Sequence, residues 1–408
     1  MTLEHAFDSF HVVKLGCKVN RVESDDFAAL ALERGLSEAQ LSQAGLVVVN
    51  TCTVTGEAEK KTRKAVRGVL RSNPKGRVIV TGCAAAIDPE TYTSMDQQRV
   101  SVVPKGQMMT FLEDLLKEAE KPANHAGDLR LRVGDSFPTR VGIKVQDGCN
   151  NACTYCIVHV ARGRAWSRPA EEILREAKAL SDAGVKEIVL TGINLGTYDH
   201  QGMTLADLCK RLLAVTAPDV RFRISSVEPR DIDEDLIQLL AASDGRICRH
   251  LHLPLQAGST KVLKEMARPY KAEFFLDLVA RLRAAVPELS LSTDIIVGFP
   301  GETEEDFQET VAVARACRFS KIHIFRYSKR AGTPAAARFD QVPPEVKAER
   351  AKRLEAVEEE LRLEDLAARK GTRELALVET DGVATTESYH TVPAPEGAAV
   401  GCLVECVL

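Results

Sequence analysis

The chain has 408 residues, of which 45% are hydrophobic and 27% are charged, and its formal net charge is −4. This length allows two or three domains, and the composition is that of an ordinary globular protein. A small negative net charge gives no global sign of nucleic-acid binding, so any contact with RNA must come from local basic patches. The N-terminus has neither a basic start nor an apolar core, and no apolar run reaches the roughly 20 residues that span a bilayer. We therefore predict a cytoplasmic protein with no membrane-spanning segment.

Residues 8–120 alternate short apolar runs with helical patterns. The runs are FHVVKL (10–15), GLVVVN (45–50), RVIVTG (77–82) and VSVVP (100–104). The helical patterns lie near 21–34, 57–72 and 109–118. β-Branched runs that alternate with helices predict a parallel sheet covered on both faces, here a flavodoxin-like α/β domain.

Three of the eleven cysteines follow the first three of these strands. They are Cys17, Cys52 and Cys83, which we call the dispersed triad. The carboxyl ends of parallel strands lie at one edge of a sheet, where open α/β sheets bind their ligands. A single buried cysteine is commonly a small hydrophobic residue. Three thiols at the same topological position favour a shared metal site.

A second strand–helix series occupies residues 135–343, after a polar linker predicted at 119–140. Its strand candidates lie at 141–146, 187–192, 221–226, 250–255, 291–298 and 321–327. Helical patterns between them lie at 170–183, 204–216, 233–243, 271–285 and 304–317. Six units instead of eight predict an incomplete (β/α)6 barrel, open on one side.

The C-terminal part of the sequence changes character twice. Residues 344–370 are charged and helical, and we predict a linker helix there. Residues 371–408 alternate apolar and polar positions between turn residues. This pattern predicts a small all-β module.

The most specific motif is GCNNACTYC, directly after the first barrel strand. It places Cys149, Cys153 and Cys156, which we call the clustered triad, in a CxxxCxxC spacing. Cysteine thiolates are the usual ligands of a 4Fe–4S cluster, and three of them leave one iron open to S-adenosylmethionine (SAM). Zinc is the alternative, with His159 as a fourth ligand, but structural zinc sites usually pair ligands from well-separated segments.

These residues resemble the radical SAM methylthiotransferase family over nearly the whole chain. The resemblance rests on LGCKVNRVES (15–24), VNTCTVTGEAEKKTRKA (49–65) and VQDGCNNACTYC (145–156). The flanks of the first two cysteines are most similar to the bacterial branch that acts on threonylcarbamoyladenosine (t6A) in tRNA.

The resemblance implies two 4Fe–4S clusters and SAM as cofactors. It assigns the radical SAM cluster, and hence catalysis, to the clustered triad, and an auxiliary cluster to the dispersed triad. It further implies a partial barrel, a C-terminal TRAM-like domain, a tRNA substrate and an electron donor such as a flavodoxin-type reductant. We expect a monomer with no membrane partner.

Two features of the sequence depart from the family pattern. His159 and Val160 stand where the family commonly has a proline and an aromatic residue. The TRAM-like tail has Arg373 as its sole basic side chain against six acids. Such a tail gives no support for RNA anchoring.

Candidate SAM contacts lie mostly at the ends of the predicted barrel strands. They are Tyr155, Thr191, Gly192, Ser226, Glu228, Gln256, Asp294 and Gly298. Strand-end glycines and hydroxyls also serve as plain turn residues. His250 and His252 alternate with leucines, a pattern that favours packed strand residues over ligands.

Basic residues concentrate at 60–77, which hold eight Lys or Arg and no acid. On a helix one face carries Lys60, Lys64, Arg67 and Arg71. A solvated amphipathic helix is the plain explanation, but the single sign favours phosphate contact. Beyond the clustered triad, Arg162, Arg164 and Arg168 are further RNA candidates, with internal pairing to carboxylates as the alternative.

Other functions compete with this prediction. One is a methylthiotransferase acting on isopentenyladenosine in tRNA or on a ribosomal protein. Another is a metal-stabilised RNA-binding protein without catalysis, which leaves the barrel pattern unexplained.

Overall fold

The computed structural model describes residues 7–53, 55–116, 139–380 and 382–408. Its described residues form two compact units. The first comprises residues up to 116 together with 148–150 and 156–164, and the second comprises 139–147, 151–155 and 165–408. The linker predicted at 119–140 therefore lies almost wholly outside the described residues. Among those that are described, no helix combines the length and the apolar character needed to cross a membrane.

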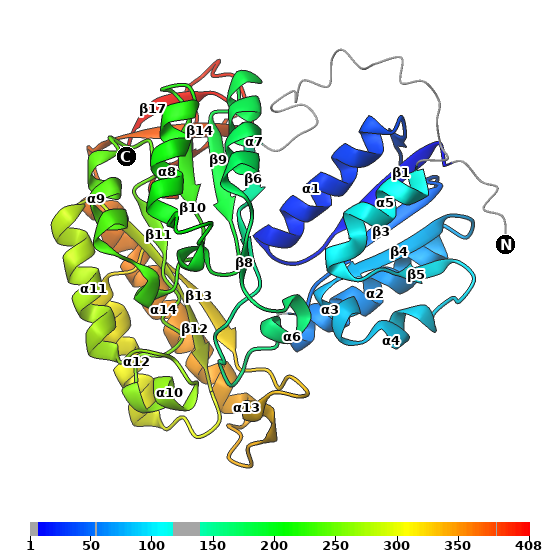
Figure 1. Ribbon diagram of the computed structural model, residues 1–408. Coiled ribbons are helices and arrows are strands. Elements are labelled where there is room, and N and C mark those ends of the chain that lie inside the picture. The colour runs from blue at the N-terminus through cyan, green and yellow to red at the C-terminus, as the bar shows by residue number, and fades with distance from the viewer. Residues whose placement is uncertain (1–6, 54, 117–138, 381) are drawn as a thin grey trace. The chain divides into compact units, whose positions relative to one another are not determined.

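The first unit is built on a parallel sheet with the strand order β2-β1-β3-β4-β5. Its strands are β1 (Ser9–Lys14), β2 (Ser37–Glu38), β3 (Leu46–Thr51), β4 (Arg77–Gly82) and β5 (Val100–Val102). Its helices from residues 1–116 are α1 (Lys18–Glu33), α2 (Gly56–Ser72), α3 (Cys83–Ile87), α4 (Pro89–Thr93), η1 (Lys105–Gln107) and α5 (Met108–Leu116). The predicted parallel α/β class is confirmed, and the short edge strand β2 was not predicted (Figure 1).

Both faces of this sheet are buried because its strands alternate apolar side chains from one face to the other. Leu46 and Val48 of β3 pack with residues of α1 and α5. Val47 and Val49 of the same strand pack with Val66 and other residues of α2, α3 and α4. The continuous apolar runs in the sequence thus encode a sheet with helices on both sides.

The second unit contains the six predicted barrel strands. They are β6 (Arg140–Lys144), β9 (Glu187–Thr191), β10 (Arg221–Ile224), β11 (His250–His252), β12 (Ser290–Val297) and β13 (Lys321–Arg326). They form two three-stranded parallel sheets, β10-β9-β6 and β11-β12-β13. Parallel bridges from Phe222 to Ile247 and from Ser226 to His252 join the two sheets.

Helices connect these strands. They are α7 (Ala170–Asp182), η3 (Leu195–Thr197), α8 (Leu205–Val215), η4 (Pro229–Asp231), α9 (Glu234–Ala242), α10 (Thr260–Glu265), α11 (Ala272–Ala285) and α12 (Glu304–Cys317). Those near 170–183, 204–216, 233–243, 271–285 and 304–317 were predicted, whereas η3, η4 and α10 were not. The loop of the clustered triad adds β7 (Gln146–Asp147), α6 (Val158–Arg162) and β8 (Trp166–Ser167). Thr204 begins α8 and Thr303 begins α12, each with a reciprocal capping box.

The C-terminal part consists of α13 (Pro334–Ala337), α14 (Pro344–Ala368) and a small sheet. This antiparallel sheet has the order β16-β15-β14-β17. Its strands are β14 (Arg373–Thr380), β15 (Val383–Thr386), β16 (Thr391–Pro393) and β17 (Leu403–Val407). The predicted all-β module is confirmed. The side chains of Leu354 and Leu361 on α14 are buried in the barrel's own core.

A buried ion-pair group joins the C-terminal module to the first barrel strands. Glu187 at the start of β9 is fully buried and pairs with Arg221 and Arg223 of β10. Arg221 Nη1 also donates to the backbone oxygen of Leu375 at 2.6 Å, and Arg223 Nη1 to that of Glu387 at 2.8 Å. One carboxylate therefore pairs with two guanidinium groups whose remaining donors hold the C-terminal sheet.

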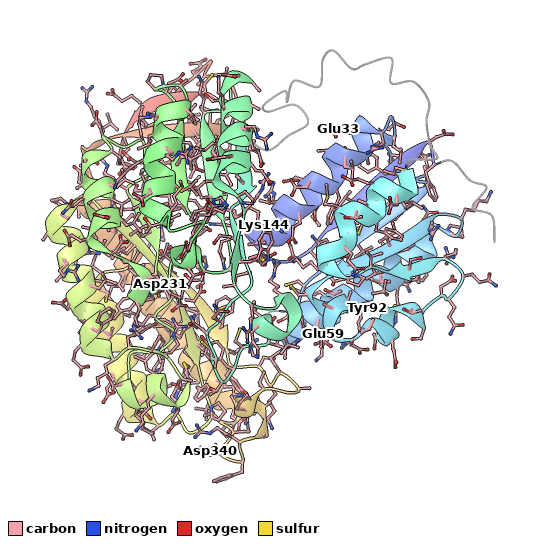
Figure 2. All side chains as sticks on the ribbon, in the orientation of Figure 1. Glu33, Glu59, Tyr92, Lys144, Asp231 and Asp340 are labelled. Atoms are coloured by element: carbon pink, nitrogen blue, oxygen red, sulfur yellow. The ribbon has the colours of Figure 1, made fainter. Side chains whose placement is uncertain are left out.

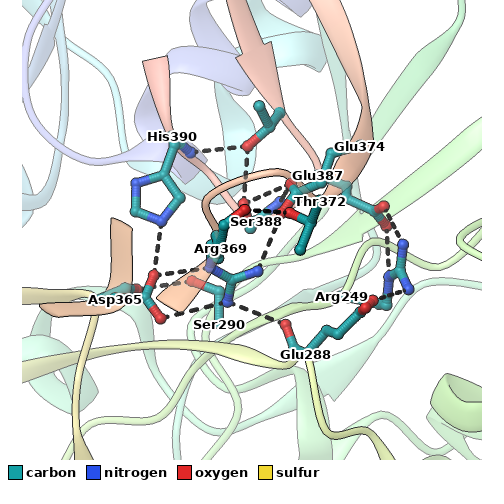
Figure 3. A network of polar contacts seen from close by, with 12 residues as sticks. Arg249, Glu288, Ser290, Asp365, Arg369, Thr372, Glu374, Glu387, Ser388 and His390 are labelled. Atoms are coloured by element: carbon teal, nitrogen blue, oxygen red, sulfur yellow. Dashed lines mark hydrogen bonds and ion pairs between the residues drawn. The ribbon is translucent and has the colours of Figure 1, made fainter. Parts of the chain in front are cut away.

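A second polar network ties the end of α14 to the same module (Figure 3). Arg369 pairs with Asp365 of its own helix and with Glu374 of β14. Arg249, just before β11, pairs with Glu387 at 2.6 Å. Charged groups that are this buried are costly unless they are paired, and the pairing here fixes where the module docks on the barrel.

Replacing Glu187 with glutamine is expected to destabilise the second unit by about 3–5 kcal/mol, because two buried arginines lose their counter-charge. Burial alone raises the pKa of Glu187, but the charges of Arg223 and Arg221 outweigh it and lower the pKa to about 2. The stabilisation is therefore complete above pH 4.5, the ordinary pKa of the carboxyl, and is lost as the pH falls towards 2.

Urea unfolding of the wild type and of Glu187→Gln, at neutral pH and between pH 5 and 3, measures this effect. Glu171→Gln is the matched control, because Glu171 forms an exposed pair with Arg211 and such pairs contribute about 1 kcal/mol at most. Equal unfolding midpoints for the two variants would contradict the predicted role of Glu187.

Candidate functional site

The dispersed triad lies at the carboxyl edge of the sheet in the first unit. Strands β3 and β4 pair Thr51 with Gly82, so the next residues, Cys52 and Cys83, leave neighbouring strands at the same level. Both cysteines are buried. Strand β1 pairs with β3 up to Lys14, and Cys17 follows three residues later. The parallel register thus brings the three cysteines to one edge, as predicted from their positions after the strands.

Two residues hold the loop of Cys17 against that of Cys52. Gly16 has a φ of +97°, and a Cβ atom there would lie 2.6 Å from the Cβ of Cys52 and 2.8 Å from its Sγ. Glycine is therefore required by both the conformation and the close approach. Asn20 donates from Nδ2 to the backbone oxygens of Leu15 at 3.1 Å and Thr51 at 2.8 Å.

A group of charged side chains surrounds the same thiols. Lys105 Nζ lies 3.9 Å from Cys83 Sγ, 3.2 Å from Asn20 Oδ1 and 2.7 Å from a carboxylate oxygen of Glu23. Arg162 of α6, which belongs to the same unit, donates from Nη2 to Asn20 Oδ1 at 2.7 Å and pairs with Glu23 at 3.5 Å. We call Asn20, Glu23, Lys105 and Arg162 the Asn20 network.

The Asn20 network carries two cations against one carboxylate. The side chains of Arg162, Glu23 and Lys105 are at most 10% exposed, so this charge is not screened by bulk water. Metals bind the thiolate form of cysteine, and Lys105 Nζ places a positive charge 3.9 Å from Cys83 Sγ. Three thiols beside an excess of buried positive charge fit an anionic thiolate-ligated cluster.

The clustered triad lies in the loop between β7 and α6. Gly148 has a φ of +71°, and a Cβ atom there would lie 2.0 Å from the backbone oxygen of Arg164, so only glycine allows this path. Cys149 donates its backbone N–H to the oxygen of Gly163 at 3.2 Å. The backbone N–H of Val158 points to Cys156 Sγ at 3.4 Å. His159, the fourth ligand of the zinc alternative, is exposed on α6.

Cys153 is buried beside a buried arginine within the second unit. Arg268 donates from Nη1 to Cys153 Sγ at 3.5 Å and from Nη2 to the backbone oxygen of Pro254 at 3.1 Å. It also pairs with Glu228. Burial raises the pKa of the Glu228 carboxyl, against the opposing charge of Arg268. A guanidinium that donates to a cysteine sulfur suits a metal-bound thiolate, since hydrogen bonds to the sulfur set the properties of iron–sulfur clusters.

The eight predicted SAM contacts fall into different environments. Thr191 is buried and its hydroxyl donates to the backbone oxygen of Ile143 at 3.2 Å. A Cβ on Gly192 would lie 2.9 Å from Gln146 Oε1, and one on Gly298 would lie 2.3 Å from the Cγ of Lys347. These three positions therefore already have local structural roles.

The other predicted SAM contacts are more open to a ligand. Tyr155 is half-buried and packs against the barrel core. Gln256 has a φ of +69° and donates its backbone N–H to the oxygen of Asp294 at 2.8 Å. Ser226 bridges to His252 between the two barrel sheets. Ser226 and Glu228 follow β10 and Gln256 follows β11, whereas Tyr155 lies in the loop of the clustered triad.

The predicted RNA face of α2 is exposed, whereas two later arginines pair with carboxylates. Lys60, Lys64, Arg67 and Arg71 all lie on the solvent side, opposite the buried residues of that helix. Arg164 is exposed. Arg162 belongs to the Asn20 network, and Arg168 pairs with Glu172 and Glu176. Both arginines therefore pair with carboxylates, which was the stated alternative to RNA contact.

Sequence reasoning missed three residues that touch the cysteines or their neighbours. They are Asn20, Lys105 and Arg268. Asn20 lies inside the motif LGCKVNRVES, three residues after Cys17, and its position in that motif is a signal. Lys105 and Arg268 reach the cysteines over 22 and 115 residues of sequence, and no local pattern marks them. Figure 2 draws the side chains on the ribbon and labels Lys144 of β6 and Asp231 of η4.

Two sequence families match the chain. The Radical SAM superfamily matches residues 143–314, and the Uncharacterized protein family UPF0004 matches residues 9–103. The first match begins within β6 and the second covers all strands of the first sheet.

Full-length relatives match as well. The threonylcarbamoyladenosine tRNA methylthiotransferase MtaB of Bacillus subtilis is 42% identical, over 86% of this chain and 80% of its own length. The MtaB of Thermotoga maritima is 38% identical, over 82% of this chain and 78% of its own length. The tRNA-2-methylthio-N(6)-dimethylallyladenosine synthase of Corynebacterium diphtheriae is 38% identical, over 92% of this chain and 76% of its own length.

A solved structure is similar in fold. The radical S-adenosylmethionine methyltransferase TsrM of Kitasatospora setae, with cobalamin and a 4Fe–4S cluster bound, aligns with a TM-score of 0.58. The alignment covers 80% of this chain and 76% of that one at 16% identity. At this identity the likeness concerns the fold alone.

If each triad holds one of two equal clusters, changing either triad to serine is expected to remove about half of the iron and sulfide, because serine does not replace a thiolate ligand. Iron and acid-labile sulfide are quantified on anaerobically reconstituted protein. Cys402→Ser is the control, because Cys402 is exposed in the C-terminal module. Loss of all iron from one triple variant and of none from the other would contradict two separate sites.

Proposed function

Because this chain belongs to the family of radical SAM tRNA methylthiotransferases, we propose that it inserts a methylthio group at carbon 2 of N6-threonylcarbamoyladenosine beside the anticodon. The observation that carries this choice of substrate is the 42% identity to the Bacillus subtilis relative, whose name states that modification. The Corynebacterium diphtheriae relative, at 38% identity, makes dimethylallyladenosine in tRNA the second candidate substrate.

The cofactors are two 4Fe–4S clusters and SAM, which when bound supply the radical needed to open an unactivated C–H bond. The clustered triad is proposed to hold the cluster that binds SAM, and the dispersed triad the auxiliary cluster. Arg268 and the backbone N–H of Val158 then donate hydrogen bonds to ligand sulfurs of the first cluster. Lys105 Nζ donates a hydrogen bond to the sulfur of Cys83, a proposed ligand of the auxiliary cluster.

One side chain of the clustered-triad loop and three that follow barrel strands are the proposed SAM contacts of first choice. They are Tyr155, Ser226, Glu228 and Gln256. Glu228 is supported by its link through Arg268 to Cys153. Thr191, Gly192 and Gly298 are proposed to shape the backbone of this region, and Asp294 lies beside a histidine of the neighbouring strand, 3.3 Å from His252 Nε2.

The proposed RNA surface is the exposed face of α2 formed by Lys60, Lys64, Arg67 and Arg71. These side chains supply positive charge to phosphates without sequence preference. Arg164 extends the proposal next to the clustered triad. Arg162, whose side chain is buried, is assigned a structural role in it because its guanidinium group pairs with Glu23. Arg168 is 28% exposed and pairs with Glu172 and Glu176, so it stays a candidate RNA contact.

The remaining partners are part of the same proposal. Reductive chemistry needs single electrons from outside the chain, and a flavodoxin-type reductant is the proposed donor. We assign a monomer as the working state. A cytoplasmic location is proposed because the tRNA-modifying relatives are bacterial.

The product is tested on tRNA from a Bacillus subtilis strain that lacks its own t6A methylthiotransferase. Anaerobic reaction with reconstituted protein, SAM and dithionite is expected to convert t6A to its 2-methylthio form, measured by mass spectrometry of nucleosides. The clustered triad changed to serine is the inactive control. Modification of dimethylallyladenosine alone would replace the proposal by the second candidate, and modification of neither base would reject both.

Lys105→Gln is expected to lower the reduction potential of the auxiliary cluster by an amount on the order of tens of millivolts, because a cation beside a ligand sulfur favours the electron-rich state. The potential is measured by redox titration with electron paramagnetic resonance, in a background with the clustered triad changed to serine. Lys105→Arg keeps the charge and serves as one control. Lys14→Gln, which removes a partly exposed lysine paired with Asp25, is the other. A potential equal in all variants would show that Lys105 does not tune the cluster.

A further inference from the structure

A group of metal-ligating side chains lies in the second unit and includes no cysteine. It comprises His252 of β11, Asp294 of β12 and His323 of β13. One imidazole nitrogen or carboxylate oxygen from each residue lies within 4.8 Å of the others. Three neighbouring strands thus present three potential ligands at one level of the sheet.

The strand register explains why these side chains meet. Strand β12 pairs Asp294 directly with His323 of β13. It pairs Ser292 with His252 of β11, and Ser292 and Asp294, two residues apart, share one face of their strand. The three ligands are therefore mounted on adjacent strands of a regular sheet, which positions a site more exactly than a loop does.

This face of the sheet is the one turned away from the covering helices. The intervening residues Leu251, Ile295 and Ile322 are buried in the core that also contains the apolar side chains of α11 and α12. Side chains alternate between the faces of a strand, so His252 and Asp294 point into the partial barrel. Asp294 is 28% exposed and His323 is exposed, so the group remains open to an ion from solvent.

A neighbouring hydroxyl orients the most buried ligand. Ser292 Oγ lies 3.0 Å from His252 Nδ1 and 3.0 Å from His250 Nε2. With Nδ1 engaged in this way, His252 Nε2 faces Asp294 Oδ1 at 3.3 Å. Metal-binding histidines commonly have their second ring nitrogen held by such a partner, which sets the tautomer and the orientation of the ring.

We propose that His252, Asp294 and His323 form a binding site for a divalent transition-metal ion, of which Zn²⁺ is the test case. Two histidines and one carboxylate are a ligand set that such ions take, with remaining positions open to water or another oxygen donor. Ligand bonds of about 2.0–2.2 Å require the three atoms to approach somewhat closer than they do here. Of the three side chains, that of His323 is exposed and that of Asp294 is partly exposed, so the approach requires small side-chain movements. The three ligands include no cysteine, and the proposal does not depend on methylthiolation.

Charge also favours a cation at this position. The carboxylate of Asp294 acts on the buried carboxyl of Glu228, whose pKa is raised by burial and, against the opposing charge of Arg268, by the neighbouring acids Asp231 and Asp294. A divalent ion between the imidazoles and Asp294 would reduce this repulsion. The competing arrangement is a metal-free hydrogen bond between His252 and Asp294, with His323 as a bystander.

The test uses reconstituted protein in which both cysteine triads are already occupied by iron. The protein is mixed with one equivalent of ZnCl2 and desalted, and zinc and iron are quantified by mass spectrometry. The wild type is expected to retain about one zinc ion per chain, and the variants His252→Gln, Asp294→Asn and His323→Gln much less, because the site has no spare protein ligand. Iron content is expected to be the same in all of them.

His11→Gln is the matched control, since His11 lies in the first unit and bonds to the backbone oxygen of Ala39. It is expected to retain zinc like the wild type. His323→Gln changes an exposed residue and so keeps the test valid if the two more buried variants fold poorly. As a second measurement, zinc is expected to raise the melting temperature of the wild type and not that of His323→Gln.

Three results would overturn the proposal. One is a wild type that retains no more zinc than His323→Gln. Another is zinc retained equally by all three variants, which places it elsewhere. The third is zinc uptake accompanied by an equivalent loss of iron, which places it at the cysteines.

Discussion

The parallel pairing of strands, in register up to their carboxyl ends, is the constraint on which the chemistry of this chain depends. The pairing of Thr51 with Gly82 puts Cys52 and Cys83 side by side although 31 residues separate them. The same rule in the barrel brings His252 and Asp294 together over 42 residues. Hydrogen bonding between backbones, which is indifferent to side chains, thus gathers side chains that local sequence cannot bring together.

Much of this arrangement could be predicted from sequence because it follows from periodicity. β-Branched runs mark the buried parallel strands, and polar N-cap residues such as Thr204 and Thr303 mark the helix starts. The position of Cys17, Cys52 and Cys83 after three such strands was enough to predict a shared edge. That prediction depended only on the topology of the sheet, which is the part of a fold that a regular sequence pattern specifies best.

The partners of the cysteines could not be predicted in the same way. Arg162 reaches Asn20 over 142 residues, and Arg268 reaches Cys153 over 115. These contacts arise from packing between segments whose local sequences carry no shared pattern. The motif that follows the clustered triad marked Arg162 as a basic residue near the substrate, whereas its side chain is almost fully buried against Glu23. Charge read from sequence does not reveal whether it faces solvent or an internal carboxylate.

The acidic tail illustrates the same difficulty with the opposite sign. Its excess of acids argued against RNA anchoring when counted along the sequence. In the structure Glu374 pairs with Arg369 and Glu387 with Arg249 (Figure 3), and Glu379 pairs with Arg140.

These three carboxylates are neutralised by arginines that lie outside the tail, from α14 and from the barrel. Half of the tail's six acids thus contribute to docking the module. A count of acids along the sequence therefore overstates the negative charge that the tail presents to a nucleic acid.

The two histidines of β11 show how one sequence pattern serves two purposes. His250 and His252 alternate with leucines, and both are buried, as expected for packed strand residues. His250 stacks on Tyr389 of the C-terminal module with ring centroids 5.0 Å apart, so it belongs to the docking contact. His252, two residues nearer the carboxyl end of the strand, instead meets Asp294.

The single hydroxyl of Ser292 contacts both rings. A hydroxyl has one proton to donate, so at least one of the two imidazoles must donate to it. If Ser292 gives its proton to His250, then His252 must donate from Nδ1, and its Nε2 is left as a lone pair facing a carboxylate oxygen. In that arrangement two acceptors face each other at 3.3 Å, and a cation between them would remove their repulsion. In the reverse arrangement Ser292 donates to His252, and His252 Nε2–H donates to Asp294 without an ion.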